Sequence, residues 1–328
     1  MPKLDIIIPH YKEDIALMQP MLDILSIQRN VNPTDFRVLI VCDGEDIILP
    51  EGFGKDMPFE VKSVTIPHGG ISAARNAGLD HSTAEWIMWC DSDDAFLMTT
   101  SLQTYFRYMT DDKAMVASAF FEEAPALDDG RMLLLWHSGK DYIFVHGKAF
   151  RRQWMIDNHV RFNNDLQLHE DAYCIAIAKS LLSKKDSVYI KDPLYLWQYN
   201  GKSVTRSYDN FVLRTYDQLC KKNAALTDEF LRRGMYVQAK GIVCRTITDA
   251  YCRLHCKSWN RRGNEDLIRD AEDSVALFLR HYDYIFKGAG DNVILAGLND
   301  LKEQLIKRDD FDEETVIGFD DWVESLRQ

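Results

Sequence analysis

The chain has 328 residues, 46% of them hydrophobic and 11% aromatic, which is enough for one large or two moderate cores and untypical of a disordered protein. Its formal net charge of -12 argues against a protein that grips DNA or RNA by broad phosphate neutralisation. Seven scattered cysteines indicate reduced thiols, and the lack of a signal-peptide-like start or a membrane-length apolar run predicts a soluble cytoplasmic protein.

The N-terminal part of the chain alternates short apolar runs with helical patterns. The apolar runs predict buried strands at residues 4–9, 36–42, 59–66 and 86–90. Helical spacing predicts a helix at 15–28, and a second helix follows the Gly69-Gly70 turn, capped near Ser72. This order of strands and helices predicts an α/β fold, with a mainly parallel sheet and helices on both faces.

Polar side chains follow three of these strands. Tyr11 comes after the first strand, Asp43 after the second, and Asp91 and Asp93 after the fourth. Because parallel strands point their carboxyl ends the same way, we expect these side chains to converge on one crevice. Asp91 and Asp93 are two positions apart and point to the same side, which suits one hard divalent ion carrying a diphosphate. An acidic turn after a strand is the alternative explanation.

The second half of the chain has a different texture. Apolar residues at helical spacing predict helices at 211–230, 236–256, 266–286 and 298–307. We therefore expect two domains, residues 1–208 with the sheet and residues 209–328 as a helical region. The acidic run at 309–314 indicates a solvated face. Cys252 and Cys256 share a helix face, but without a second ligand pair they indicate core thiols rather than a zinc site.

Several motifs, in consistent order over about residues 4–206, resemble family 2 glycosyltransferases of the GT-A fold. The N-terminal ones are IIIPHY at 6–11, VCDG at 41–44, GISAARNAG at 70–78 and DSDD at 91–94, where the last is similar to an Asp-x-Asp metal motif. Later ones lie at 146–152, 161–162, 169–171, 195–199 and 203–206. Two departures are Cys42, where the family often has an acid, and His10, where it has a small polar residue.

The resemblance implies a Rossmann-like GT-A domain that binds a nucleotide-sugar, with a UDP-sugar favoured. It implies that Pro9, Tyr11 and Asp43 surround the base, which needs a flat surface and a hydrogen-bond partner. The implied donor-binding residues are Pro9, Tyr11, Asp43, Arg75, Asn76, Asp91, Ser92, Ser203 and Arg206. A half-buried loop aromatic is the plainer explanation for Tyr11, and a solvated loop for 202–206.

The resemblance also implies roles in the chemistry. Asp93, with Asp91 on the metal or the ribose, would hold Mn²⁺ or Mg²⁺ against the leaving diphosphate. Ser203 and Arg206 would close over the phosphates. Asp171 would be the base that activates an acceptor hydroxyl, with Glu170 as a supporting acid and inversion at the anomeric carbon. Acids in the first turn of a helix are also simply good capping residues.

The expected function is therefore a metal-dependent, inverting hexosyl or N-acetylhexosaminyl transferase with a polysaccharide, glycolipid or polymer acceptor. Two alternatives remain open, a transferase acting on modified nucleic-acid bases and a non-catalytic nucleotide-sugar binding module. The acidic charge disfavours a nucleic-acid partner. We expect no transmembrane segment, and leave open peripheral membrane contact and an acceptor-binding or homo-oligomerising role for the helical region.

Overall fold

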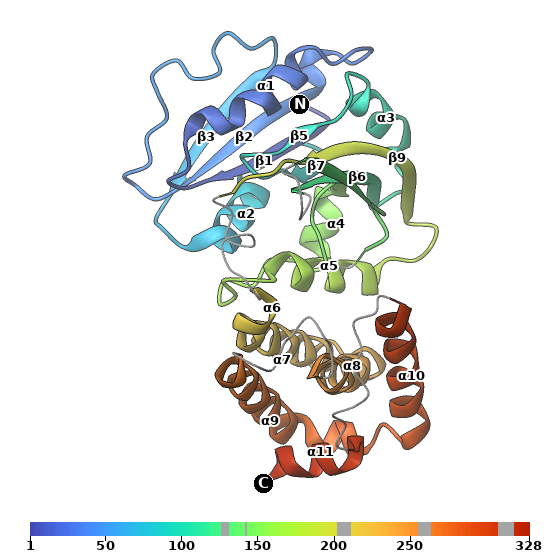
Figure 1. The fold of residues 1–328 in the computed structure, drawn as a ribbon. Coiled ribbons are helices and arrows are strands. Elements are labelled where there is room, and N and C mark those ends of the chain that lie inside the picture. Colours follow the sequence, from blue (N-terminus) through green and yellow to red (C-terminus); the bar gives the residue numbers. More distant parts are fainter. Residues whose placement is uncertain (126–130, 142, 202–210, 255–263, 308–317) are drawn as a thin grey trace. The chain divides into compact units, whose positions relative to one another are not determined.

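The computed structural model describes residues 1–125, 131–141, 143–201, 211–254, 264–307 and 318–328. The chain divides into two compact units, Met1–Gly201 and Lys202–Gln328. The boundary predicted from the sequence, between residues 208 and 209, lies outside the described residues. The first unit holds a mixed sheet and the second holds helices (Figure 1).

The first half of the sheet is parallel, as the sequence predicts. Its strands are β1 (Leu4–His10), β2 (Phe36–Asp43), β3 (Glu60–Ile66) and β4 (Trp86–Trp89), in the order β3-β2-β1-β4. Every residue of β1, β2 and β4 is buried, because these runs are apolar on both faces and the sheet is covered on both. β3, at the sheet edge, alternates between exposed and half-buried residues.

The second half of the sheet is mixed, a feature that the apolar runs in the sequence do not predict. It contains β8 (Lys148–Arg151), β6 (Met115–Pro125), β9 (Ser187–Trp197) and the short β5 (Ala95–Phe96), in this order after β4. Only β6 and β9 pair in parallel here, whereas β8 is antiparallel to both β4 and β6. β7 (Met132–His137) pairs with β6 as an antiparallel hairpin.

Helices lie on both faces of the sheet, as predicted (Figure 1). A 3₁₀ turn, η1 (Ile15–Met18), leads into α1 (Gln19–Ser26), which shares one face with α3 (Ser101–Tyr108), and a second turn, η2 (Pro33–Asp35), precedes β2. The other face carries α2 (Gly70–His81), α4 (Arg152–Asp157) and α5 (Glu170–Leu181). α2 lies very close to β1, since a Cβ added at Gly78 would stand 2.2 Å from Cγ2 of Ile7.

One buried ion pair fastens the start of the sheet. Asp5 in β1 has no exposed surface and accepts hydrogen bonds from Arg37 Nε (2.9 Å) and Nη2 (2.6 Å) in β2. The same carboxylate accepts bonds from the Ser82 hydroxyl and from the backbone N–H groups of Thr83 and Ala84. A buried charge is tolerated only with such partners, so this acid links two strands to the loop that follows α2.

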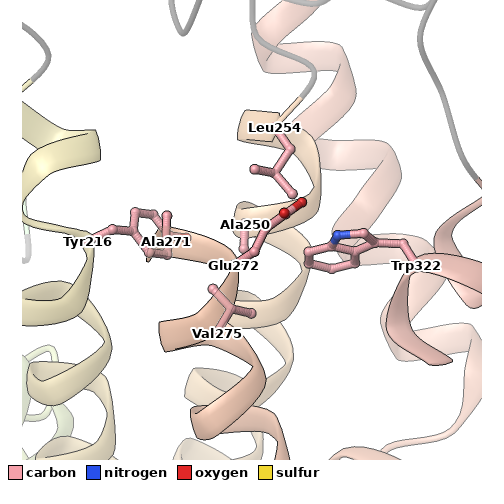
Figure 2. A pocket seen from close by; sticks show the side chains of 7 residues that line it. All are labelled: Tyr216, Ala250, Leu254, Ala271, Glu272, Val275 and Trp322. Atoms are coloured by element: carbon pink, nitrogen blue, oxygen red, sulfur yellow. The ribbon is translucent and has the colours of Figure 1, made fainter. Parts of the chain in front are cut away.

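The second unit is helical. Its helices are α6 (Phe211–Arg214), α7 (Tyr216–Arg232), α8 (Tyr236–Leu254), α9 (Glu265–Lys287), α10 (Asp291–Lys307) and α11 (Phe319–Arg327). Figure 2 shows side chains of α7, α8, α9 and α11 meeting around a small pocket lined by Tyr216, Ala250, Leu254, Ala271, Glu272, Val275 and Trp322. One apolar core therefore serves these four helices. α10 begins earlier than predicted, and α11 was not predicted.

Three sequence expectations bear on this region. Residues 309–314 and Cys256 lie outside the described residues, so the solvated acidic face and the assignment of Cys256 as a core thiol stay predictions. All six cysteines in the described ranges are free and buried, as expected for core thiols. None of the helices within those ranges is both long and apolar enough to cross a membrane.

Candidate active site

The carboxyl ends of β1 and β2 form a pocket. A hollow of about 170 Å³ is lined by Pro9, His10, Tyr11, Glu13, Asp43, His68, Gly70, Ile71 and Ala74. Pro9 and Asp43 are buried, while Tyr11 is half-buried. The predicted convergence of the residues that follow these two strands is therefore present, because parallel strands end at the same edge.

The Asp43 carboxylate holds the backbone turn at Gly69 and Gly70 beside this pocket. Its carboxylate accepts hydrogen bonds from the backbone N–H groups of Gly69 (2.8 Å) and Gly70 (2.9 Å), and lies 2.9 Å from His68 Nδ1. His68 in turn stacks on the Tyr11 ring, with centroids 4.4 Å apart and planes 14° apart. The two rings and the carboxylate give the pocket a flat aromatic surface beside a hydrogen-bond acceptor.

Arg75, on α2, joins two acidic groups that are far apart in the sequence. Nη2 donates to Asp91 Oδ1 (2.8 Å) after β4, and Nη1 donates to Glu170 Oε1 (2.7 Å) at the start of α5. The guanidinium is buried and lies 5.3 Å from the centroid of the Phe162 ring. Although burial opposes it, the charges of Asp91 and Glu170 hold the pKa of Arg75 above its usual range.

Two residues implied as donor-binding therefore have partners within the protein. Both terminal nitrogens of Arg75 donate hydrogen bonds to carboxylates. Asn76 donates to the Phe162 carbonyl (2.9 Å) and to Asn164 Oδ1 (3.0 Å), and accepts a bond from the Phe162 N–H (3.0 Å). Ser92 is buried between the acids, and Ser203 and Arg206 lie outside the described residues. The roles of these five residues stay predictions.

The acids after β4 differ in their environments. Burial tends to raise the pKa of Asp91, but the Arg75 charge outweighs it and the net pKa lies below its usual range. Burial raises the pKa of Asp93, with Asp91 adding to the effect and a 2.9 Å hydrogen bond from Asn200 opposing it. Asp94 is fully buried, accepts bonds from the Tyr195 hydroxyl (2.6 Å) and the Gln198 N–H (3.1 Å), and has a pKa well above its usual range because of burial.

The structure brings together a set of candidate cation ligands that shares only Asp91 with the predicted pair. Asp91, Asp94 and His146 offer ligand atoms that all lie within 4.8 Å of one another. Burial lowers the pKa of His146 to about 4, so its imidazole is neutral at physiological pH, the form in which it binds metals. Two carboxylates and a neutral imidazole fit a divalent ion such as Mn²⁺. Asp93 is not in this set, and its predicted role as a ligand remains untested.

Asp171, the predicted base, has a pKa near neutral. Burial raises its pKa to about 7, with the neighbouring Glu170 adding to the effect and Arg75 opposing it. Its Oδ1 accepts a hydrogen bond from the Ala172 N–H (2.7 Å), so Asp171 also stabilises the first turn of α5. The preceding His169 adopts φ 63°, the left-handed conformation, where a non-glycine residue is strained.

Comparison with known proteins identifies the family of the chain. Residues 5–167, about half of its length, match the family described as Glycosyl transferase family 2. The chain belongs to glycosyltransferase family 2. It is 26% identical to the minor teichoic acid biosynthesis protein GgaA of Bacillus subtilis (strain 168) over 64% of this chain and 51% of that protein. It is 24% identical to the putative glycosyltransferase EpsH of the same organism, over 61% of this chain and 63% of that protein. The chain thus spans less than two thirds of either relative.

The fold of this family 2 chain is similar to solved structures. The crystal structure of S. aureus TarS 1-349 matches with a TM-score of 0.58 and 14% identity, over 93% of this chain and 92% of that one. The same TarS fragment in complex with UDP-GlcNAc also matches with a TM-score of 0.58, over 97% and 95% of the two chains. At this identity the likeness concerns the fold. It confirms the predicted GT-A-like sheet followed by a helical region.

Sequence reasoning on the family 2 motifs missed three side chains. His68 follows β3 directly before the Gly69-Gly70 turn, a position at the sheet edge that could have drawn attention to it. The motifs at 91–94 and 146–152 contain Asp94 and His146 but indicate no role for either. Neither the burial of Asp94 nor its contact with Tyr195 has a signal in local sequence.

Proposed function

We propose that this family 2 chain transfers a sugar from a nucleoside diphosphate donor, with a UDP-sugar favoured, to a hydroxyl of a polysaccharide, glycolipid or polymer acceptor. The observation that carries the proposal is the Arg75 bridge, which joins the acidic cluster after β4 to the Glu170-Asp171 pair. One charged side chain thereby fixes the candidate diphosphate-side acids relative to the candidate base. A protein that only bound nucleotide-sugars has no use for a base with a pKa near neutral.

The donor base fits the pocket beside β1 and β2. The Tyr11 and His68 rings offer a surface on which a uracil can stack, and Asp43 supports the turn that carries His68. A UDP-sugar is favoured because TarS, similar in fold, has been solved with UDP-GlcNAc. The curated relative GgaA is a teichoic acid biosynthesis protein, which supports a polymer acceptor.

The reaction is an in-line displacement at the anomeric carbon. The Asp171 carboxylate takes the proton of the acceptor hydroxyl, whose oxygen forms the new bond to the anomeric carbon. The bond from that carbon to the diphosphate oxygen breaks, and its electron pair leaves with the nucleoside diphosphate, so the configuration inverts. Glu170 holds Arg75, and Arg75 keeps Asp91 ionised.

A divalent cation completes the proposed site. Asp91, Asp94 and His146 would hold it, with Asp93 the further candidate from the sequence, and Mn²⁺ or Mg²⁺ bound there would neutralise charge on the leaving diphosphate. Asp94 is protonated more readily than a free acid because burial raises its pKa. A cation at this place would favour its ionised form. We also propose that the helical unit binds acceptor or mediates self-association.

The test is release of UDP from UDP-GlcNAc and UDP-glucose, with and without acceptor, since many transferases leak to water. We expect UDP release in the presence of Mn²⁺, and we expect EDTA to abolish it. Asp171→Asn should abolish release while calorimetry shows unchanged UDP binding, whereas the exposed-acid control Asp165→Asn should behave like the parent. Donor binding without UDP release in the parent chain would instead establish a non-catalytic binding module.

A further inference from the structure

Strand β7 exposes an apolar surface that the proposed activity does not use. Its residues from Met132 to Trp136 are five consecutive large hydrophobic side chains, with exposed fractions of 46%, 45%, 56%, 42% and 55%. Successive side chains of a strand point to opposite faces, so apolar groups stand exposed on both faces of β7. Single exposed hydrophobic residues are ordinary, but a contiguous run of this kind marks an interaction surface.

The outer edge of β7 has no partner strand among the described residues. Within the part of the chain that the structure describes, β7 pairs only with β6, from Phe120 opposite His137 to Pro125 opposite Met132 (Figure 1). Among these residues, the backbone N–H and C=O groups on its other side have no strand partner, so the described part of the sheet ends in an edge here. Natural sheets protect such edges with charged residues, proline or bulges, and residues 132–136 contain no charge and no proline.

We propose that β7 pairs with β7 of a second copy of this chain, as antiparallel strands about a two-fold axis at Leu134. In this register Met132 faces Trp136 of the second copy, Leu133 faces Leu135, and Leu134 faces itself. Every pair is apolar against apolar, so no like charges oppose each other although each chain carries a net charge of -12. A two-fold interface closes on itself and gives a dimer.

The open edge is what favours a protein strand over a lipid surface. Acyl chains cannot hydrogen-bond the free N–H and C=O groups of the edge, and burying these groups without partners is unfavourable. A membrane would also cover only one face of β7, whereas the exposed side chains lie on both. A second β7 satisfies the backbone groups and extends the sheet, bringing its own apolar side chains beside those on both faces.

The first test is the oligomeric state of the full chain over a concentration series by analytical ultracentrifugation. We expect a concentration-dependent dimer for the parent. Leu134→Lys, which places two like charges at the axis, should shift the monomer–dimer equilibrium at least tenfold toward monomer. The control Ile48→Lys changes an 85% exposed residue elsewhere in the same unit and should leave the dimer intact. Far-ultraviolet circular dichroism checks that both variants are folded.

The second test fixes the register. Cysteines at Leu134 would stand about 4.5–5.5 Å apart between Cα atoms across an antiparallel pair, which suits a disulfide. Two cysteines at Leu133 would be offset along the strands by two residues, about 8 Å apart, which is too far. We therefore expect Leu134→Cys, and neither Leu133→Cys nor the parent, to form a covalent dimer under mild oxidation.

Three results would overturn the proposal. The parent could remain monomeric at every concentration. The dimer could persist in Leu134→Lys, which would place the interface elsewhere. Finally, a monomeric parent could float with phosphatidylcholine–phosphatidylglycerol vesicles while Leu134→Lys does not, which would assign β7 to a membrane surface instead.

Discussion

Replacing Asp171 by asparagine should stabilise the protein at alkaline pH while removing its activity. The pKa of this carboxyl rises from 3.8 to about 7 on folding, chiefly through burial. A difference of about three units, at about 1.36 kcal/mol per unit, sets an upper limit of about 4 kcal/mol. Because the side chain is only partly buried, solvent screening reduces this figure, and we expect a gain of about 1–2 kcal/mol.

The sign and the pH window follow from the direction of the shift. Between pH 3.8 and about 7 the folded chain keeps a proton on Asp171 that the unfolded chain has lost, so stability falls as pH rises through this window. Above pH 7 both states are ionised, and the cost of holding the partly buried carboxylate charge in the folded parent reaches its maximum. The neutral asparagine carries none, and its side-chain oxygen can still accept the bond from the Ala172 N–H.

Urea unfolding of the parent and of Asp171→Asn at pH 4.5 and pH 8 measures this difference. We expect a higher free energy of unfolding for the variant at pH 8 and a much smaller difference at pH 4.5, with Asp165→Asn unchanged at both. The reasoning is refuted if the variant is less stable than the parent at pH 8, or if the difference is the same at both pH values. A gain in stability together with lost UDP release is the trade-off expected of a strained catalytic group.

Three further predictions concern neighbouring groups. Glu170→Gln removes a negative charge that raises the pKa of Asp171, so the acidic limb of kcat/KM should move to lower pH, and a move to higher pH would contradict the assignment. Tyr11→Ala removes a stacking surface worth about 1–3 kcal/mol, so calorimetry should show UDP binding at least fivefold weaker; unchanged affinity would place the base elsewhere. Asp5→Asn leaves buried Arg37 with only the more distant Glu60 carboxylate at 3.6 Å, and urea unfolding should show a loss of about 3–5 kcal/mol, whereas a loss below 1 kcal/mol would mean that Glu60 is a sufficient partner.

The parts of the fold that were predicted are those encoded locally. The strands at 4–9, 36–42 and 86–90 were found to within a residue or so, because a fully buried parallel strand is a continuous apolar run. The mixed half of the sheet was not, since the neighbours of β8 and β6 come from distant parts of the chain. α11 was missed because it is only nine residues long, although Phe319, Trp322, Val323 and Leu326 give it an apolar face.

The site likewise has residues whose positions were predictable from the sequence and residues whose contacts were not. Tyr11 and Asp43 could be placed near each other from the sequence, because their strands lead to one edge of the sheet. The pairing of Arg75 with Glu170 could not, since it depends on where α5 lies in the folded chain rather than on spacing along it. The low pKa of His146 and the high pKa of Asp94 likewise arise from burial, which local sequence does not encode.

Through Arg75, the charge state of Asp91 is coupled to the pKa of Asp171 in the proposed site. Asp91 raises the pKa of Asp171 and Arg75 lowers it. When a bound cation takes up the charge of Asp91, more of the guanidinium charge is left for the other carboxylates, and Asp171 should release its proton more readily. Donor and cation binding should therefore lower the pKa of Asp171. By reciprocity, the donor should bind more tightly at alkaline pH. We therefore expect an ordered mechanism in which the nucleotide-sugar binds before the acceptor, and in which Asp171 is more fully ionised once the donor is bound.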